Sequence, residues 1–379
     1  MVMFLMKSSR NISRSRGGVD MQIQKVVKCK VVGLTRTKQN CIKTEHDNLQ
    51  KLLQLESHGL DFLPIYQSVQ LHSANKQQAL RFYKQINPNH EYALSLRNDL
   101  LRVDFKPNNK VAKYWAKIPN KTSKKLWVAI KPHIKGINFS QYKLGESKLF
   151  KKEQTWWLYI TISKEVQVKE SYSNMISIDL GSKVIATVCG SQGNQRPMFL
   201  GREVRGIRRH YQHLRTELGK KKLLKKIKEL SDKEQRTIND VLHKTAKQVV
   251  AYAEQTDSYI VLGDLKGIRR SSLKKGRRFC RIVSNMPYLK LTQYIEYKTN
   301  EKGIKVIRID ERGSSKTCSK CGYSDKANRK TQGLFKCRSC GYEINADVNG
   351  CRNILKFSQG YTPSERAVVT QPQTVRCIT

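Results

Sequence analysis

Four cysteines in the last quarter of the chain restrict its folding more tightly than any other feature. Cys318 and Cys321 are separated by two residues, as are Cys337 and Cys340, and fifteen residues lie between the two pairs. Two knuckles with this spacing can close a tetrahedral four-thiolate site, for which Zn²⁺ is the expected ion. Because no fifth ligand is in sight, we expect this zinc to be structural and not catalytic.

Two glycines and the remaining cysteines fit this interpretation. Gly322 and Gly341 each follow the second cysteine of a knuckle, where a chain that turns around a metal favours glycine. The other cysteines are scattered, a pattern that fits a reduced interior better than a disulfide framework. They are Cys29, Cys41, Cys189, Cys280, Cys351 and Cys377.

The charge of the chain narrows the class of partner. Its 379 residues include 73 Lys and Arg against 30 Asp and Glu, which gives a formal net charge of +43. Such an excess repels itself unless a polyanion neutralises it, and nucleic acid is the obvious polyanion. An enzyme that acts on small molecules has no need of so large a positive charge. The length suggests about two or three domains.

The start of the chain gives no sign of export. No stretch approaches the roughly 20 apolar residues of a membrane span, and the apolar residues 1–6 are too few for a signal-peptide core. Residues 7–16 are rich in Ser and Arg, as in an organelle transit peptide, but an unstructured extension explains them more simply.

The first 170 residues indicate a mostly antiparallel β domain interrupted by helices. Alternating and β-branched residues predict strands at 21–33, 126–130 and 156–162. Apolar residues at helical spacing predict a small helical insertion at about 44–85.

Two aromatic pairs in this half have two interpretations. Trp156 with Trp157, and Trp115 with Tyr114, could stack on nucleic-acid bases. Aromatic residues in β segments more often fill a core, and we favour that interpretation.

The second half predicts an α/β domain, because strand, hairpin, helix, strand, helix and strand follow one another. Asp179 lies at the tip of the predicted hairpin. The predicted elements are strands at 175–180, 183–189, 259–262 and 304–311, and helices at 202–228, 232–256 and 288–300.

Two segments of this half concentrate positive charge. Residues 202–228 hold eleven basic residues against two acids, and residues 266–281 hold eight bases and no acid. We interpret the first as a helix that lies along phosphates and the second as a flexible basic loop, although a solvated basic face is the simpler alternative. The candidate nucleic-acid contacts are Arg205, Arg208, Arg209, Lys221, Lys222, Lys225, Arg269, Arg270, Lys274 and Lys275.

Three acidic segments complete a recognisable set. They are residues 178–181 (Ile-Asp-Leu-Gly), 262–265 (Leu-Gly-Asp-Leu) and 345–350 (Asn-Ala-Asp-Val-Asn-Gly), joined by residues 94–99, by Asn239-Asp240 with His243-Lys244, and by the first knuckle at 317–322. In this order they resemble the TnpB family, the OrfB proteins of bacterial insertion sequences, which are relatives of the type V CRISPR effector nucleases. The resemblance covers nearly the whole chain.

The resemblance implies a multidomain α+β architecture. An N-terminal β-barrel wedge domain with a helical recognition insertion is followed by an α/β RuvC nuclease domain of RNase H-like fold with an inserted zinc ribbon. The implied bounds are a disordered extension at 1–20, the wedge domain at 21–43 and 92–170, the recognition insertion at 44–91, the RuvC-like domain at 171–312 and 341–357, the ribbon at 313–340 and a disordered tail at 358–379.

The resemblance also implies a function. The family performs RNA-guided cleavage of DNA and is associated with transposons, so the partners would be a guide RNA and a double-stranded target with its displaced single strand, in the bacterial cytoplasm. Its chemistry is hydrolysis by two Mg²⁺ ions held by converging carboxylates. Asp179 and Asp347 match the first and third acids of the pattern. Taken alone, Asp179 could be a turn residue and Asp347 a helix N-cap.

The second acid departs from the family pattern. The family commonly has Glu where this chain has Gly263, and glycine cannot bind a metal. Asp264 is a poor substitute, because side chains alternate along a strand and Asp264 points to the opposite face. Glu311, at the end of the next predicted strand, could fill the space that Gly263 leaves. We therefore expect Asp179, Glu311 and Asp347 to form the magnesium site, while a surface ion pair of Glu311 with Arg308 or Arg312 is the alternative.

Three functions remain open. An active RNA-guided DNA endonuclease is the first, and a cleavage-defective RNA-guided repressor, for which loss of the acid at Gly263 would be the signature, is the second. A non-guided zinc-ribbon DNA binder is the third, but it leaves Asp179 and Asp347 without a role. Co-purified RNA would separate the third from the others, and Mg²⁺-dependent cutting would separate the first two.

Overall fold

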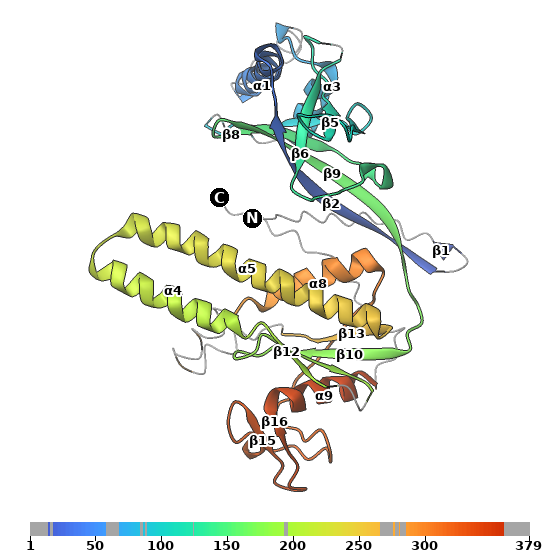
Figure 1. The fold of residues 1–379 in the computed structure, drawn as a ribbon, viewed down its shortest axis with the longest axis vertical. Helices are drawn as coiled ribbons and strands as arrows, with labels where there is room; N and C mark the ends of the chain where they lie inside the picture. The colour runs from blue at the N-terminus through green and yellow to red at the C-terminus, as the bar shows by residue number, and fades with distance from the viewer. Residues whose placement is uncertain are drawn as a thin grey trace. The chain divides into compact units, whose positions relative to one another are not determined.

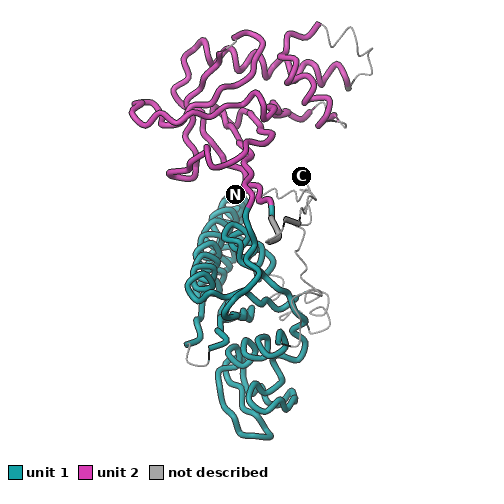
Figure 2. The backbone as a smooth tube through the Cα atoms, turned by 90° about the vertical axis from the view of Figure 1, so that its right-hand side faces the viewer, with its two compact units in different colours: residues 1, 10–21, 166–371 teal, residues 2–9, 22–165, 372–379 magenta. Residues whose placement is uncertain are grey.

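The structure is a computed structural model that divides the chain into two compact units, coloured in Figure 2. Of the described residues, unit 2 contains those from 22 to 165, and unit 1 contains those from 166 to 359 together with 14–15 and 18–21. The structure describes residues 14–15, 18–57, 68–83, 86–87, 89–123, 125–192, 196–265, 276, 280 and 286–359.

The framework of unit 2 is an antiparallel sheet in the order β3-β8-β9-β2-β6-β5-β4, with β7 beside β9. Strand β1 pairs with the first residues of β2, and these paired residues belong to unit 1. No pairing joins the end strands β3 and β4 in the described residues, so closure into a barrel stays a prediction. The strands are β1 Arg14–Ser15, β2 Gly18–Val32, β3 Leu94–Leu96, β4 Arg102–Phe105, β5 Tyr114–Lys117, β6 Trp127–Pro132, β7 Lys143–Leu144, β8 Ser147–Lys152 and β9 Thr155–Val168, with a 3-10 helix η1 at Phe139–Gln141.

Two helices cover this sheet. Helices α1 (Arg36–Ser57) and α3 (Ser73–Phe82) bury apolar residues against the core of unit 2, including Ile42, Leu49 and Leu53 of α1. Helix α1 begins before the predicted start at residue 44, because its first turn is polar and the apolar period is visible only from Cys41 and Ile42 onward.

A buried carboxylate connects these helices to the loop between β5 and β6. Glu45 of α1 is 1% exposed and accepts hydrogen bonds of 2.8 Å from the backbone N–H of His72 and from the Asn75 amide, and one of 2.9 Å from the backbone N–H of Lys121. Because both carboxylate oxygens are satisfied, the charge can be buried at this junction.

The aromatic pairs in unit 2 belong mainly to its framework. Trp156 is 4% exposed in the core, the Trp115 indole donates to the carbonyl of Ala112, and the Tyr114 hydroxyl donates to the carbonyl of Ile137. The core interpretation holds for Trp156 and Tyr114, whereas Trp115 and Trp157 are half-buried and are not part of the core cluster.

Unit 1 contains a five-stranded sheet in the order β12-β11-β10-β13-β14. Strand β10 (Asn174–Asp179) pairs antiparallel with β11 (Ala186–Gly190), which pairs antiparallel with β12 (Met198–Leu200). It also pairs in parallel with β13 (Ser258–Gly263), which pairs in parallel with β14 (Val306–Ile309). The predicted hairpin and α/β order are confirmed. The second hairpin strand begins at Ala186, after a longer turn than the sequence suggested.

Helices cover both faces of this sheet. Figure 1 shows α5 (Leu224–Gln255) and α8 (Tyr288–Lys302) on one face and α9 (Ala346–Gln359) on the other. Helix α4 (Glu203–Lys220) lies antiparallel beside α5.

The prediction of one basic helix over 202–228 is wrong. The chain reverses at residues 221–223, where Lys222 adopts a positive φ of 53°, so the lysines after it begin α5. Because the basic run carries few apolar residues, its composition gave no sign of the turn.

Several segment boundaries also differ from those expected from the sequence. The small hairpin of β15 (Leu334–Lys336) and β16 (Glu343–Asn345) follows a 3-10 helix η3 (Lys326–Asn328) and reaches past residue 340, where the ribbon was expected to end. Residues 14–15 and 18–20, expected to be disordered, pair as strands, and α9 extends to Gln359. No helix of the described residues is both long and apolar enough to cross a membrane.

Candidate functional site

Asp179 is the last residue of β10, at the edge of the sheet where the chain turns toward β11. Ile178 is paired with Leu262 of β13. Because side chains alternate along strands, the next residues, Asp179 and Gly263, project from the same face. A side chain at position 263 would therefore lie beside the Asp179 carboxylate.

The carboxylate of Glu311 occupies the space at Gly263. A Cβ placed on Gly263 would lie 2.8 Å from Cδ of Glu311 and closer still to Oε2. Glu311 follows β14 by two residues, and Ile309 of that strand pairs with Gly263. The long glutamate side chain thus reaches back from β14 over the end of β13.

The ion-pair alternative for Glu311 is wrong. Arg308 pairs with Glu296 at 2.5 Å, and Arg312 pairs with Asp310 at 3.3 Å. Within the described part of the chain, no ion pair uses Glu311. After burial, the negative charge of Asp264 is the next cause of the raised pKa of Glu311.

Asp347 lies in the first turn of α9, which packs against β10 and β11. The helix is capped by Asn345, whose side-chain oxygen accepts from the backbone N–H groups of Asp347 and Val348, at 2.9 and 3.3 Å. The N-cap interpretation of Asp347 is therefore wrong, and its carboxylate is left to face the turn after β10. A Cβ on Gly181 of that turn would be 3.8 Å from both Asp347 carboxylate oxygens.

The electrostatics of the three acids show that they share one environment. Withdrawal from water raises the pKa of Asp179 to about 7, and the charges of Glu311 and Asp347 add to the rise. Withdrawal from water, followed by the charges of Asp264 and Asp310, raises the pKa of Glu311 to about 7. The pKa of Asp347 is raised by its burial and lowered by Arg329. Such a cluster of carboxylates favours a cation.

The carboxylate oxygens of the three acids are spread more widely than the ligands of a single metal ion would be. In the described residues, only the four cysteines form a group of three or more candidate ligands whose atoms all lie within 4.8 Å of one another. Carboxylates that bracket two ions about 4 Å apart need a wider arrangement. Repulsion between acids that no cation neutralises also favours a wider spacing.

Sequence reasoning missed three residues at this site. Arg329, from the ribbon segment, lies 3.5 Å from the carboxylate of Asp347, and Gln332 donates a 2.6 Å hydrogen bond to the hydroxyl of Ser182, beside the β10 turn. Tyr288, at the start of α8, has its pKa raised by burial and by the charges of the three acids. No local pattern marks any of the three, because they reach the site only through tertiary packing.

The four cysteine sulfurs converge. Sγ of Cys318 is 3.8 Å from Sγ of Cys340, and Sγ of Cys321 is 3.6 Å from Sγ of Cys337. A tetrahedron with metal–sulfur bonds of about 2.3 Å has edges of about 3.8 Å, so the four thiolates fit Zn²⁺ without rearrangement. The two glycines after the knuckles adopt φ values of 81° and 69°, as their positions predicted.

Two buried asparagines of α9 join the segment of the first cysteine knuckle to the carboxylate site. Asn349 accepts from the backbone N–H of Ser319 at 2.9 Å and donates to the carbonyl of Thr317 at 2.8 Å. Asn353 donates to the carbonyls of Ser314 and Thr317 at 2.7 and 2.6 Å. The first cysteine knuckle is thereby held against the helix that carries Asp347.

The candidate nucleic-acid contacts are distributed over several elements. Arg205 and Arg209 lie on α4, Lys221 and Lys222 in the turn and Lys225 at the start of α5. Arg208 is half-buried, and burial lowers its pKa while Glu234 of α5 opposes that effect, so it serves the helix pair more than the surface. Arg269, Arg270, Lys274 and Lys275 lie outside the described residues.

The chain is similar in sequence to several known proteins. Residues 288–354 match the family model described as the Cas12f1-like TNB domain. The CRISPR-associated endodeoxyribonuclease Cas12f1 of Sulfoacidibacillus thermotolerans is 33% identical over 232 residues, which are 56% of this chain and 53% of that protein. A TnpB-like protein of Methanocaldococcus jannaschii is 28% identical over 227 residues, 58% of this chain and 79% of that protein.

The extent of these matches is limited. The chain spans about half of the Cas12f1 relative and 28% and 40% of two other CRISPR-associated endodeoxyribonucleases. A solved complex of Cas12f1 with guide RNA and target DNA aligns with 88% of this chain at 14% identity and a TM-score of 0.40. The resemblance to TnpB proteins and their type V relatives is confirmed by the sequence matches.

Proposed function

We propose that this chain, a relative of TnpB proteins and Cas12f nucleases, is an RNA-guided DNA endonuclease whose second catalytic acid has moved from position 263 to Glu311. The observation that carries the proposal is the Glu311 carboxylate, which fills the space left by Gly263 beside Asp179. The strand order of unit 1, three antiparallel strands followed by two parallel ones, supports the expected RNase H-like fold.

The donor set fits magnesium. Asp179, Glu311 and Asp347 offer only carboxylate oxygens, the ligands that hard cations prefer. Burial raises the pKa of each, neighbouring acids add to the rise at Asp179 and Glu311, and Arg329 and Lys183 oppose it at Asp347. When bound, a pair of Mg²⁺ ions would activate a water and stabilise the leaving oxygen of the scissile phosphodiester. The three acids would hold and orient that pair.

Two further groups have roles in this arrangement. Arg329 offsets part of the negative charge of Asp347, and it could move from the carboxylate to a phosphate oxygen when DNA enters. The Tyr288 hydroxyl stays protonated near the acids, so it can donate a hydrogen bond but adds no charge.

The partners in this proposal are a guide RNA and a double-stranded DNA target with its displaced strand. In guided nucleases, base pairing supplies sequence recognition while the protein holds the backbone of the heteroduplex. The net charge of +43 and the exposed basic residues at the α4–α5 turn support contacts of the protein with a nucleic-acid backbone. The four thiolates would hold one structural Zn²⁺.

A cleavage-defective RNA-guided repressor is the second candidate. The observation in its favour is Gly263 itself, which lacks the acid that the family commonly has at this position. Guide binding and cutting are separable, so a chain without a working metal site could still occupy its target.

The test begins with expression of the chain together with its flanking genomic DNA. RNA that co-purifies is sequenced, and a plasmid matched to that RNA is incubated with the complex with and without Mg²⁺. Cutting that needs the matched site and Mg²⁺ supports the endonuclease. Specific binding without cutting supports the repressor, and absence of both bound RNA and matched cutting contradicts both.

Variants then assign the site. Asp179→Ala and Glu311→Ala should each lower cleavage by at least about a hundredfold, because each removes a metal ligand, while guide RNA binding is retained. Asp310→Asn, at the neighbouring exposed acid, is the matched control and should cut normally. Normal cutting by Glu311→Ala with none by Asp179→Ala would show that the acid has not moved to Glu311.

A further inference from the structure

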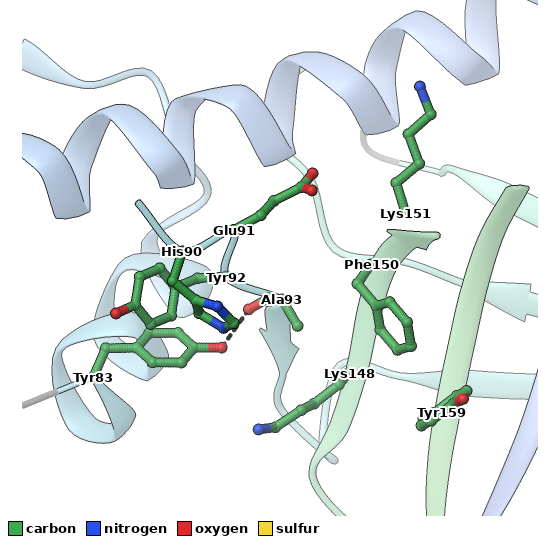
Figure 3. A pocket seen from close by; sticks show the side chains of 9 residues that line it. All are labelled: Tyr83, His90, Glu91, Tyr92, Ala93, Lys148, Phe150, Lys151 and Tyr159. Carbon is green, nitrogen blue, oxygen red and sulfur yellow. Dashed lines mark hydrogen bonds between the residues drawn. The ribbon is translucent and has the colours of Figure 1, made fainter. Parts of the chain in front are cut away.

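Unit 2 contains a cavity of about 360 Å³ that no role described so far uses. It opens between the end of α3, the segment leading into β3 and the face of β8 and β9 (Figure 3). Its lining consists mainly of aromatic and basic side chains. The residues are Tyr83, His90, Glu91, Tyr92, Ala93, Lys148, Phe150, Lys151 and Tyr159.

The aromatic rings form two groups on opposite sides of the cavity, as Figure 3 shows. Tyr92 packs edge-on against Tyr83 and His90, with ring centroids 4.6 and 4.8 Å apart. Phe150 and Tyr159 form the second group, with centroids 4.8 Å apart and an angle of 80° between their planes. All four Phe and Tyr residues are only half-buried, so each group still offers ring surface to a ligand, although the Lys28 ammonium lies over the Tyr159 ring, 5.2 Å from its centroid.

Hydrogen bonds hold the first group in place. The Tyr83 hydroxyl donates to the carbonyl of Ala93 at 2.6 Å, and the Tyr92 hydroxyl accepts from the backbone N–H of Asn87 at 2.7 Å. Rings fixed in this way lose little conformational freedom when a flat ligand stacks on them.

Positive charge borders the same space. Lys148 and Lys151 extend from β8 toward different sides of the cavity in Figure 3, and neither forms an ion pair with a described residue. The acid in the lining, Glu91, lies 3.8 Å from Nε2 of His46, and its carboxylate could accept from the N–H groups of a base.

We propose that this cavity binds one unpaired nucleotide of a single-stranded nucleic acid. The base would stack on Phe150 or Tyr159, and the adjoining phosphates would lie against Lys148 and Lys151. Aromatic rings accept the face of any base, and lysines bind the backbone, whereas the bases of a duplex keep their faces covered. The proposal rests on the nucleic-acid function above and adds a site to it.

Crosslinking of the unaltered chain tests the site without any substitution. The probes are a short oligouridylate and a short oligothymidylate, each containing one photoreactive 4-thio base, and the same thio-DNA annealed into a duplex. We expect adducts on Phe150, Tyr159 or Tyr92 with the single strands and not with the duplex. The comparison of RNA with DNA shows which strand is the source. Adducts found only elsewhere in the chain overturn the proposal.

Affinity measurements with the same oligonucleotides add a second readout. The double variant Phe150→Ala/Tyr159→Ala should bind the single strands about tenfold more weakly and the duplex as before, because stacking is lost. Phe105→Ala is the matched control, since Phe105 is 58% exposed in the same unit and lies outside the cavity. The conservative variants Phe150→Trp and Tyr159→Phe keep a ring and should bind normally even if the alanine variant fails to fold.

The lysines are tested through salt. Lys148→Gln/Lys151→Gln should reduce the slope of log affinity against log salt by about 1.4 for single strands, corresponding to two lost phosphate contacts, whereas the aromatic variants should leave the slope unchanged. A change of less than twofold in all variants would overturn the site. If that result accompanied guided cleavage, only the cavity proposal would fail, whereas absence of bound RNA would remove the proposed function as well.

Discussion

At the residue scale, Glu311 and Gly263 depend on each other. The Glu311 carboxylate lies where a side chain on residue 263 would be, so an acid can occupy this space from β13 or from β14 but not from both. Alternation along β13 predicted that Asp264 could not serve, and the same reasoning identified Glu311. By contrast, Arg329 and Tyr288 could not be predicted, because nothing near them in the sequence indicates that they approach Asp347.

His243 gives a prediction about pH. Its ring stacks on Tyr294 at 3.9 Å, its Nδ1 lies 3.1 Å from the Tyr297 hydroxyl, and burial together with nearby lysines lowers its pKa to about 4. Between pH 4 and about 6.5 the unfolded state binds a proton at His243 more readily than the folded state does. Protonation of His243 therefore lowers the free energy of unfolding as the pH falls below about 6.5 and has no effect above that pH.

The measurement is thermal unfolding of the chain and of His243→Gln at pH 5 and pH 7. The unaltered chain should lose more stability than the variant on going from pH 7 to pH 5. Other titrating groups act on both proteins and cancel in the comparison. An equal loss would show that His243 does not carry a lowered pKa.

At the element scale, the main strands and helices of unit 1 could be predicted because each has a clear apolar period. The reversal at 221–223 could not, since the basic run around it has no period to interrupt. Strands β15 and β16 have three residues each, too few to show alternation. In the ribbon, the cysteine spacing was informative where the periodicity was not.

Asn349 should link the ribbon to α9. Asn349→Ala leaves the N–H of Ser319 and the carbonyl of Thr317 without this side-chain partner in a buried position, which should destabilise the chain by about 1–3 kcal/mol. We also expect slower cleavage, because Asp347 lies on the same turn of α9. Lys336→Ala, at an exposed ribbon position, is the control. Unfolding curves and cleavage rates that match those of the control would contradict the link.

The four thiolates predict a metal content. Elemental analysis of the purified chain should find one zinc per molecule, and Cys337→Ser should lower that content because a buried ligand is removed. Cys189→Ser, at a cysteine outside the cluster, should retain the metal. A chain that folds and cleaves with no zinc would contradict a structural role.

At the scale of the whole molecule, the charge of +43 predicted a polyanionic partner but not where it binds. The structure divides the basic residues between the α4–α5 turn, the lysines of the unit 2 sheet and segments outside the described residues. The aromatic cavity could not be predicted from the sequence, because the residues that line it are up to 76 positions apart, from Tyr83 to Tyr159.

The most direct test of the account is to move the acid back. Glu311→Ala should nearly abolish guided cleavage, and adding Gly263→Glu to that variant should restore a substantial part of it, because the new carboxylate would enter the vacated space beside Asp179. Gly263→Glu alone should be impaired, since two side chains would compete for one space. Full cleavage by Glu311→Ala, with no effect of Gly263→Glu in either background, would contradict the relocated acid.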